Sequence, residues 1–287
     1  MPSTLRQALS QAHQQLKLAL ALDEHEARLD ARLLLGHVLQ QDHAWLIAHE
    51  SDALEANIHA AFEASVKRRI EGEPIAYILG HREFYGLDLR VTPATLIPRP
   101  DTEVLVEAAL AKIPLEQSTR ILDLGTGTGA IALAIARNRP HAIVTAVDAS
   151  AEALAVAQEN ALLLHISNVR FVLSNWFEAL NEEDGSGKYD IIVSNPPYIA
   201  TGDVHLEQGD LRFEPPTALA SGSDGLDDIR HIIKAAPVYL RTNGWLMLEH
   251  GYDQSQAVAR LMAESGFVDT QHQYDLANVA RVTIGRT

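Results

Sequence analysis

The sequence contains no cysteine in 287 residues. This absence excludes disulfides, a thiol nucleophile and any site in which cysteine holds zinc or an iron–sulfur cluster. The 13 histidines are scattered and form no His-Glu-x-x-His pair, the spacing that places two zinc ligands on one helix face. We therefore expect no metal centre.

Basic residues are scarce as well. The 23 lysines and arginines face 38 acidic residues, which gives a formal net charge of −15. The stretch 182–230 alone has 11 acidic residues against Lys188, Arg212 and Arg230. Nucleic-acid binding draws much of its affinity from cations that neutralise phosphates, so we expect no direct nucleic-acid partner. The acidic stretch suits either a basic protein surface or a solvated loop.

Long hydrophobic runs are also missing. No segment approaches the roughly 18 consecutive apolar residues of a membrane span, and residues 1–6 lack the basic-then-apolar plan of a signal peptide. With 47% hydrophobic and 21% charged residues the composition is that of an ordinary globular protein. We expect a cytoplasmic monomer without membrane association, although no pattern in the sequence specifies the oligomeric state.

The pattern of residue types changes twice along the chain. In residues 1–73 apolar side chains recur at helical spacing, which predicts a small helical domain. Residues 74–100 are rich in aromatic and β-branched residues punctuated by glycine and proline, which predicts a linker with a β-hairpin at 82–91. Residues 101–287 form the third predicted region.

Strands and helices alternate in this third region. Asp101 is predicted to cap a helix that runs to about residue 112. The alternation beyond it predicts a doubly wound parallel sheet, with residues 182–187 as a connector. The predicted strands are 120–124, 143–148, 169–173, 189–194 and 244–249; the predicted helices are 129–138, 151–162, 226–240 and 253–265; and an antiparallel hairpin of 267–274 and 279–285 is predicted at the sheet edge.

A glycine turn follows the first strand of this sheet. It consists of Gly125, Thr126, Gly127, Thr128 and Gly129, and a helical stretch comes directly after it. Glycines permit a tight turn and close approach of a ligand to the backbone. The spacing is G-x-G-x-G without a phosphate-seeking lysine, so neither a dinucleotide nor a P-loop nucleotide is favoured.

Polar residues follow the next two strands. Asp148 ends the second strand, where an acid is suited to accept hydrogen bonds from ribose hydroxyls. The alternative role, capping the following helix, is weaker because Ser150 is available as the cap. Asn175 and Trp176 follow the third strand and are placed to flank an adenine ring, while core packing explains Trp176 nearly as well.

The tetrapeptide Asn195-Pro196-Pro197-Tyr198 directly follows the apolar strand 189–194. An Asn side chain holds a planar amide or amino group in one orientation. The two prolines stop the strand and leave the carbonyls of Asn195 and Pro196 free to face a ligand, and Tyr198 supplies a flat face.

Together these residues resemble a class I S-adenosylmethionine-dependent methyltransferase, and most closely the family that methylates a glutamine of peptide chain release factors. The resemblance runs nearly end to end. The segments that carry it are Glu73–Gly80, Arg82–Gly86, Leu96–Glu103, the glycine turn, the Asn-Pro-Pro-Tyr element and Leu248–Gly251. One departure is Asn175, which stands where the family often has Asp.

The resemblance implies an α/β fold, a Rossmann-like seven-stranded sheet with a small all-helical N-terminal domain. It implies S-adenosylmethionine as cofactor and S-adenosylhomocysteine as product. It implies that residues 101–287 are the catalytic domain and that the substrate is the glutamine of the Gly-Gly-Gln motif in class I peptide chain release factors. The helical domain of residues 1–73 is then expected to dock this substrate, although its surface residues also fit ordinary solvated helix faces. The implied catalytic residues are Asn195, Pro196 and Tyr198. The implied substrate contacts are Asn195, Pro196, Pro197 and Tyr198, and the implied cofactor contacts are Gly125, Thr126, Gly127, Thr128, Gly129, Asp148, Trp176 and Asn195.

Two other functions are compatible with parts of this pattern. The same tetrapeptide occurs in enzymes that methylate the amino group of adenine in DNA, where Tyr198 would stack on a flipped base; the negative charge and the lack of a basic recognition region oppose this. A non-catalytic cofactor-binding protein would need the acceptor half of the site to have decayed, whereas both halves are intact.

Overall fold

The computed structural model describes residues 3–180 and 188–287, so the predicted connector at 182–187 lies outside the described residues. The chain divides into two compact units, Met1–Gly80 and His81–Thr287. Each unit has its own hydrophobic core and is described separately.

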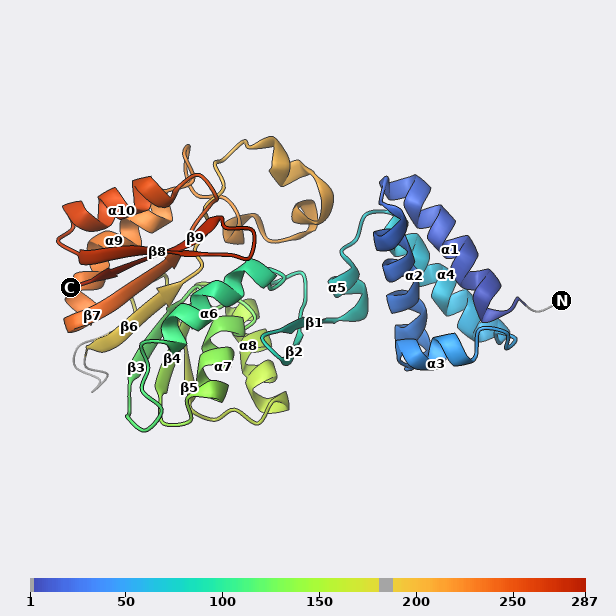
Figure 1. The fold of residues 1–287 in the computed structure, drawn as a ribbon, viewed down its shortest axis with the longest axis horizontal. Helices are drawn as coiled ribbons and strands as arrows, with labels where there is room; N and C mark the ends of the chain where they lie inside the picture. Colours follow the sequence, from blue (N-terminus) through green and yellow to red (C-terminus); the bar gives the residue numbers. More distant parts are fainter. Residues whose placement is uncertain (1–2, 181–187) are drawn as a thin grey trace. The chain divides into compact units, whose positions relative to one another are not determined.

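The smaller unit is helical, as predicted (Figure 1). Its core contains the fully buried side chains of Leu16, Leu34, Leu35 and Phe62. One helix was not predicted: α5 starts after Pro74 and ends at Gly80, whose φ of 79° allows the left-handed turn there. The helices are α1 Leu5–Leu20, α2 Glu24–Leu39, α3 His43–Ala48, α4 Ala56–Ile70 and α5 Ile75–Leu79.

The larger unit begins with the β-hairpin, which has the predicted position. Strand β1, His81–Phe84, pairs antiparallel with β2, Leu87–Arg90. The two turn residues, Tyr85 and Gly86, have φ values of 49° and 74°, the left-handed conformation that matches a two-residue turn to the twist of its strands.

A seven-stranded sheet forms the centre of the larger unit, as predicted. In the part of the chain that the structure describes, its order is β5-β4-β3-β6-β7-β9-β8. The first five strands in this order are parallel, and β9 and β8 form the predicted antiparallel hairpin at the edge. The strands are β3 Arg120–Leu124, β4 Ile143–Asp148, β5 Val169–Leu173, β6 Tyr189–Ser194, β7 Leu240–Glu249, β8 Val268–Tyr274 and β9 Ala280–Arg286.

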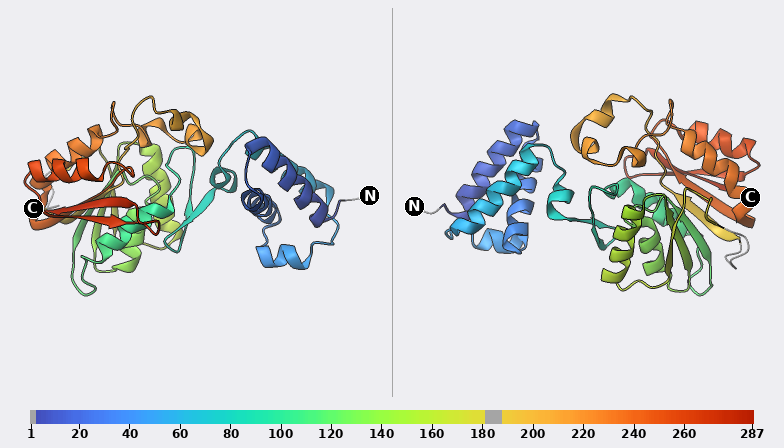
Figure 2. Two further views of the ribbon diagram at one scale, coloured as in Figure 1. Left: turned by 45° about the horizontal axis from the view of Figure 1, so that its top comes forward. Right: turned by 180° about the vertical axis from the view of Figure 1, so that it is seen from behind.

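Helices cover both faces of the sheet (Figures 1 and 2). Helices α6, α7 and α8 pack on one face, where Leu133 and Ile121 belong to one core cluster. Helices α9 and α10 pack on the other face, where Ile232 and Leu246 belong to a second cluster. The helices are α6 Glu103–Leu110, α7 Ala130–Asn138, α8 Ala151–Leu163, α9 Asp227–Tyr239 and α10 Ser255–Glu264. The central strands β3 and β6 are mostly buried, as their largely apolar sequences require, whereas the edge strand β5 is only partly buried.

The two predicted helix caps had different outcomes. Ser150 caps α8 as predicted, because its Oγ accepts the N–H of Ala153 at 3.1 Å. The prediction for Asp101 was wrong. A short 3₁₀ turn, Pro100–Thr102, precedes α6, and the Asp101 carboxylate instead forms an ion pair with Arg281 at 2.7 Å.

The strand order reverses next to β3. The chain runs outward from β3 through β4 to β5 and then returns to β6 on the other side of β3. In open α/β sheets, ligands bind outside the carboxyl ends of the strands at such a reversal. Among the described residues no helix has the length and apolar character to cross a membrane, and no group of three His, Asp or Glu side chains is placed to hold a metal.

Candidate active site

A cleft of about 620 Å³ opens at the carboxyl ends of β3, β4, β5 and β6. Residues that follow all four strands line it, and segments from two loops complete the wall. The lining residues used below are Gly125, Gly127, Asp148, Glu152, Asn175, Trp176, Asn195, Pro197 and Asp228, together with residues of 93–96 and 215–220. The structure thus brings both predicted halves of the site into one cavity.

The glycine turn forms the floor of the cleft. Gly125 and Gly127, with φ values of 72° and 56°, lie on the cleft wall. A Cβ on Gly125 would lie 3.5 Å from the Trp176 ring, so the tryptophan covers this glycine closely. Thr126 and Thr128 are buried and, like Gly129, are not among the lining residues, so their contribution is to shape the turn.

Asp123, just before the turn, is a buried carboxylate that the sequence analysis did not single out. It is 0% exposed, and its Oδ2 accepts the Thr126 hydroxyl at 2.6 Å. Its Oδ1 has no hydrogen-bond partner among the described residues. Burial raises the pKa of Asp123 to about 7, although the Thr126 hydrogen bond opposes this shift.

Asp148 points its carboxylate along the cleft wall. Oδ2 accepts the N–H of Gly127 at 2.8 Å and Oδ1 accepts the N–H of Ser150 at 2.9 Å. Each oxygen therefore uses one lone pair on the backbone and keeps another for a ligand. This arrangement holds the glycine turn and leaves an acceptor suited to a vicinal diol.

Trp176 and Asn175 also reach the cleft, as their positions in the sequence predict. The Trp176 indole N–H donates to the Asp228 carboxylate at 3.2 Å, and its φ of 49° shows an uncommon backbone conformation. Asn175 is exposed, and its amide donates to Glu178 at 2.8 Å. Asp228, which orients the indole, was missed because it lies about fifty residues away in the sequence.

The Asn-Pro-Pro-Tyr element forms the other end of the cleft. Asn195 and Pro197 line it, while Pro196 is buried and Tyr198 is half-buried behind them. The Asn195 side chain donates from Nδ2 to the Thr102 hydroxyl at 3.1 Å. Gln254 fixes the backbone of the element, because its Nε2 donates to the Tyr198 carbonyl at 3.0 Å.

The two loops of the cleft wall are joined by a buried carboxylate. Glu214 accepts the N–H of Ile97 at 2.9 Å and forms an ion pair with Arg99. Glu103 accepts the N–H of Tyr85 at 3.1 Å. Arg99, whose role could not be predicted, therefore joins the two loops of the cleft wall, whereas Glu103 holds the turn of the β1–β2 hairpin.

The charge of the cleft restricts its ligand. Asp148, Glu152 and Asp228 are among the lining residues, whereas no lysine, arginine or histidine of the described chain is. A phosphate group would meet repulsion here, but a cation would be attracted. The glycine floor, the diol acceptor, the indole and the acidic wall fit a nucleoside that carries a positive charge, as S-adenosylmethionine does.

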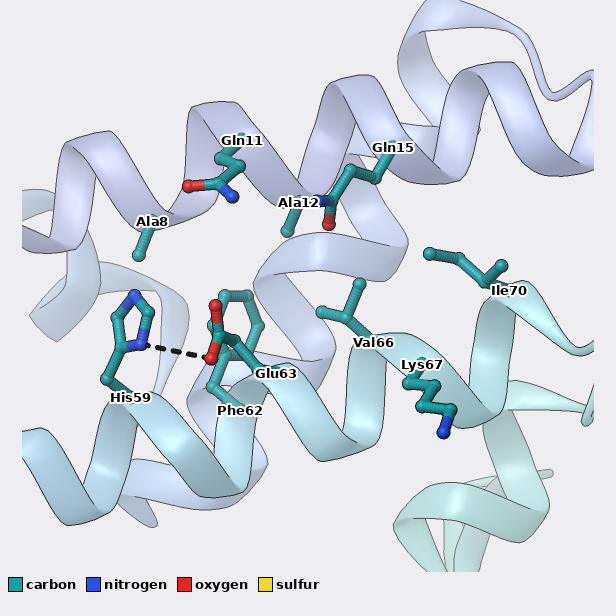
Figure 3. Close-up of a pocket in the computed structure, with 10 residues that line it drawn as sticks. All are labelled: Ala8, Gln11, Ala12, Gln15, His59, Phe62, Glu63, Val66, Lys67 and Ile70. Atoms are coloured by element: carbon teal, nitrogen blue, oxygen red, sulfur yellow. Dashed lines mark ion pairs between the residues drawn. The ribbon is translucent and has the colours of Figure 1, made fainter.

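A second cavity lies within the helical unit, between α1 and α4 (Figure 3). It measures about 220 Å³ and is lined by Ala8, Gln11, Ala12, Gln15, His59, Phe62, Glu63, Val66, Lys67 and Ile70. His59 and Glu63 pair across one helical turn at 3.4 Å. This cavity brings together no nucleophile, oxyanion donor or cofactor-binding turn, so it does not compete with the cleft.

The fold and this cleft define a class I S-adenosylmethionine-dependent methyltransferase. The methyltransferase small domain model matches residues 100–211. A solved T. thermophilus 16S rRNA N2 G1207 methyltransferase, in complex with S-adenosylmethionine and guanosine, superposes with a TM-score of 0.52 and 23% identity over 72% of this chain and 49% of its own. At this identity the similarity concerns the fold alone.

The particular family follows from closer relatives. The PrmC N-terminal domain model matches residues 7–80. A release factor glutamine methyltransferase of Xylella fastidiosa is 50% identical over 269 residues, which are 94% of this chain and 96% of the relative. The Vibrio cholerae protein of the same name is 47% identical over 286 residues, 100% of this chain and 98% of its own. This chain belongs to the release factor glutamine methyltransferase family.

Proposed function

We propose that this protein transfers the methyl group of S-adenosylmethionine to the side-chain amide nitrogen of the glutamine in the Gly-Gly-Gln motif of class I peptide chain release factors. S-adenosylhomocysteine is the product. The observation that carries the proposal is the single acidic cleft that joins the glycine turn to Asn195 and Pro197. The family to which the chain belongs supports the choice of substrate.

The cofactor-binding residues that we propose are Gly125, Thr126, Gly127, Thr128, Gly129, Asp148, Trp176 and Asn195. Asp148 would accept the ribose hydroxyls and Trp176 would flank the adenine, since both line the cleft. Thr126 and Thr128 would act through the backbone of the turn. When bound, the cofactor supplies a methyl group on a positively charged sulfur.

The acceptor-binding residues that we propose are Asn195, Pro196, Pro197 and Tyr198. An amide nitrogen is a weak nucleophile, and its proton is too weakly acidic to be removed before attack by a side chain with a pKa near 7. Orientation of the two reactants, worth roughly 7–11 kcal/mol, is then the main source of rate enhancement. The Asn195 Oδ1 and the Pro196 carbonyl would accept the two amide N–H groups and stabilise the positive charge that develops on nitrogen.

The helical unit would dock the release factor, and the acidic surface of the larger unit would attract basic segments of that partner. We propose that the protein acts as a cytoplasmic monomer that makes no direct contact with nucleic acid. The domain division of 1–73, 74–100 and 101–287 remains part of this proposal.

The experiment that tests the function is transfer of labelled methyl from S-adenosylmethionine to a purified class I release factor. Two comparisons run beside it: the same factor with the Gly-Gly-Gln glutamine replaced, and duplex DNA. Label that disappears with the glutamine supports the proposal. Label in DNA, or in neither acceptor, contradicts the substrate assignment.

A further inference from the structure

A chain of polar side chains runs from Asn195 away from the cleft into the protein interior. The Asn195 Nδ2 donates to the Thr102 hydroxyl at 3.1 Å. The hydroxyls of Thr102 and Tyr198 lie next to the carboxylate of Glu249, and both lower its pKa. Thr102 and Glu249 are only 4% and 2% exposed, so water does not replace these contacts.

Sheet register accounts for this meeting. Ser194 of β6 pairs with Leu248 of β7 in parallel register. The next residue of each strand is Asn195 and Glu249, so the two side chains leave the sheet at the same edge. Thr102, in the 3₁₀ turn before α6, lies between the side chains of Asn195 and Glu249. Glu249 Oε2 has no hydrogen-bond partner among the described residues, and a buried carboxylate oxygen in this position needs a functional or structural reason.

While Glu249 is ionised, the side chains of Asn195, Thr102 and Glu249 have only one consistent arrangement of donors and acceptors. An ionised carboxylate only accepts, so the single proton of the Thr102 hydroxyl points to Glu249. The Thr102 oxygen is then an acceptor toward Asn195, and only the Nδ2 end of the Asn195 amide can satisfy it. The Oδ1 end is left to face the cleft.

We propose that Thr102 and Glu249 are positioning residues that fix the direction of the Asn195 amide, so that its oxygen is presented to the substrate amide N–H. This inference rests on the proposed function, in which Asn195 accepts from the substrate. It adds that the acceptor element does not orient itself and depends on two side chains from outside the tetrapeptide.

The ionisation of Glu249 decides which group donates and which accepts in the hydrogen bond between Thr102 and Asn195. Burial raises the pKa of Glu249 to about 7, although the neighbouring Thr102 hydroxyl lowers it. The other groups that face Glu249 are Asp101, which favours its protonated form, Arg281, which favours its ionised form, and Tyr198. Burial, followed by the charge of Glu249, raises the pKa of Tyr198, so its phenol remains a donor. Protonated Glu249 can donate to Thr102, which frees the Thr102 proton to meet the other end of the Asn195 amide.

The test compares Thr102→Val with Thr102→Ser in methylation of the release factor. Valine removes the hydroxyl at nearly constant shape, whereas serine keeps it. We expect Thr102→Val to lower kcat by about tenfold to a hundredfold, with little change in cofactor Kd, and Thr102→Ser to restore kcat to within about threefold. The matched control is Thr283→Val, which removes a buried hydroxyl that hydrogen-bonds His250 and His272 and not Asn195. Its kcat should stay near wild type.

Two further measurements distinguish orientation of the Asn195 amide by Thr102 from a role of Thr102 in packing alone. In an Asn195→Ala background, Thr102→Val should cost almost nothing more, because the amide that it orients is absent. The wild-type kcat should fall as pH drops below about 7 and then level off at no more than the tenfold to hundredfold loss expected of Thr102→Val. Glu249→Gln, which cannot ionise, should remove that dependence.

The proposal is overturned if Thr102→Val and Thr102→Ser lower kcat equally. It is also overturned if the double variant loses kcat by the product of the losses of Thr102→Val and Asn195→Ala, or if Glu249→Gln keeps the wild-type pH profile of kcat. Should Thr102→Val fail to fold, the Glu249→Gln profile still decides. If wild-type protein leaves the release factor unlabelled, the proposed function fails instead, so the two failures are distinguishable.

Discussion

Replacing Asp148 by asparagine tests the cofactor half of the site with the smallest change in shape. The Asp148 carboxylate accepts one N–H on each oxygen, from Gly127 at 2.8 Å and from Ser150 at 2.9 Å. An ionised carboxylate has about four lone-pair positions, so about two remain for the ribose diol. Asparagine keeps one acceptor oxygen and turns the other position into a donor.

The expected loss can be worked from these contacts. A hydrogen bond to a charged group contributes about 1.5–3 kcal/mol. The substitution removes one of the two hydrogen bonds to the ribose diol and weakens the other, because the charge of the acceptor is lost. It also places the asparagine NH2 group opposite one of the two backbone N–H groups. We therefore expect cofactor binding to weaken by on the order of 3 kcal/mol, which is about a hundredfold in Kd.

Calorimetric titration with S-adenosylhomocysteine measures this Kd without turnover. Asp190→Asn is the matched control, because the Asp190 carboxylate also accepts a backbone N–H, from Arg120 at 2.8 Å, but lies at the amino end of β6. The control should bind the cofactor as wild type does. A Kd for Asp148→Asn within about threefold of the control would refute the role in diol binding and leave only support of the glycine turn.

Three further changes probe other parts of the larger unit. Asn195→Ala should lower kcat by about 10²–10³ with little effect on cofactor Kd; near-normal turnover would remove Asn195 from the reaction. Gly225→Ala should lower kcat and cost at least about 1 kcal/mol of stability, because φ is +75° and a Cβ would lie 2.2 Å from the Tyr198 carbonyl oxygen; a wild-type kcat would contradict that expectation. Asp123→Asn tests pH dependence: since burial raises the Asp123 pKa from 3.8 to about 7, the wild-type protein should lose stability as pH rises from about 4 to about 7, by on the order of 4 kcal/mol from this group. Glu249, whose pKa burial also raises to about 7, contributes to the loss in both proteins. Urea unfolding at pH 5 and pH 8 should therefore show a smaller loss of stability for the variant than for wild type, and equal losses in the two proteins would refute the prediction.

The fold was predictable because the local sequence patterns of the strands and turns agree with the way in which a parallel sheet must be connected. Each buried strand is a short apolar run bounded by a turn signal, as at 120–124 before the glycine turn, and parallel strands have little freedom in how they connect. The elements that the sequence did not reveal depend on tertiary contacts. Helix α5 is only five residues long, too short for a periodic pattern, and it exists because Ile78 completes the core of the helical unit.

The candidate site was predictable only where its residues follow strands directly. Asp148 is the last residue of β4, and Trp176 and Asn195 come soon after the ends of β5 and β6. Parallel strands bring such positions to one edge of the sheet. Thr102 and Asp228 lie on or before helices, so no local pattern distinguishes them from ordinary cap residues. Asp101 illustrates the same limit, since it has the sequence signature of a cap but pairs with Arg281 at 2.7 Å, far along the chain.

The relation between the two halves of the site follows from a single pair of neighbouring strands. Leu124 of β3 and Ser194 of β6 are in register, and the buried Ser194 hydroxyl donates to the Leu124 carbonyl at 2.7 Å. The glycine turn begins directly after one of these residues and Asn195 directly after the other. Neighbouring strands lie about 4.8 Å apart, so the cofactor turn and the acceptor element leave the sheet side by side. If the proposed roles of the two elements hold, the sheet register brings the methyl donor and the acceptor amide close together.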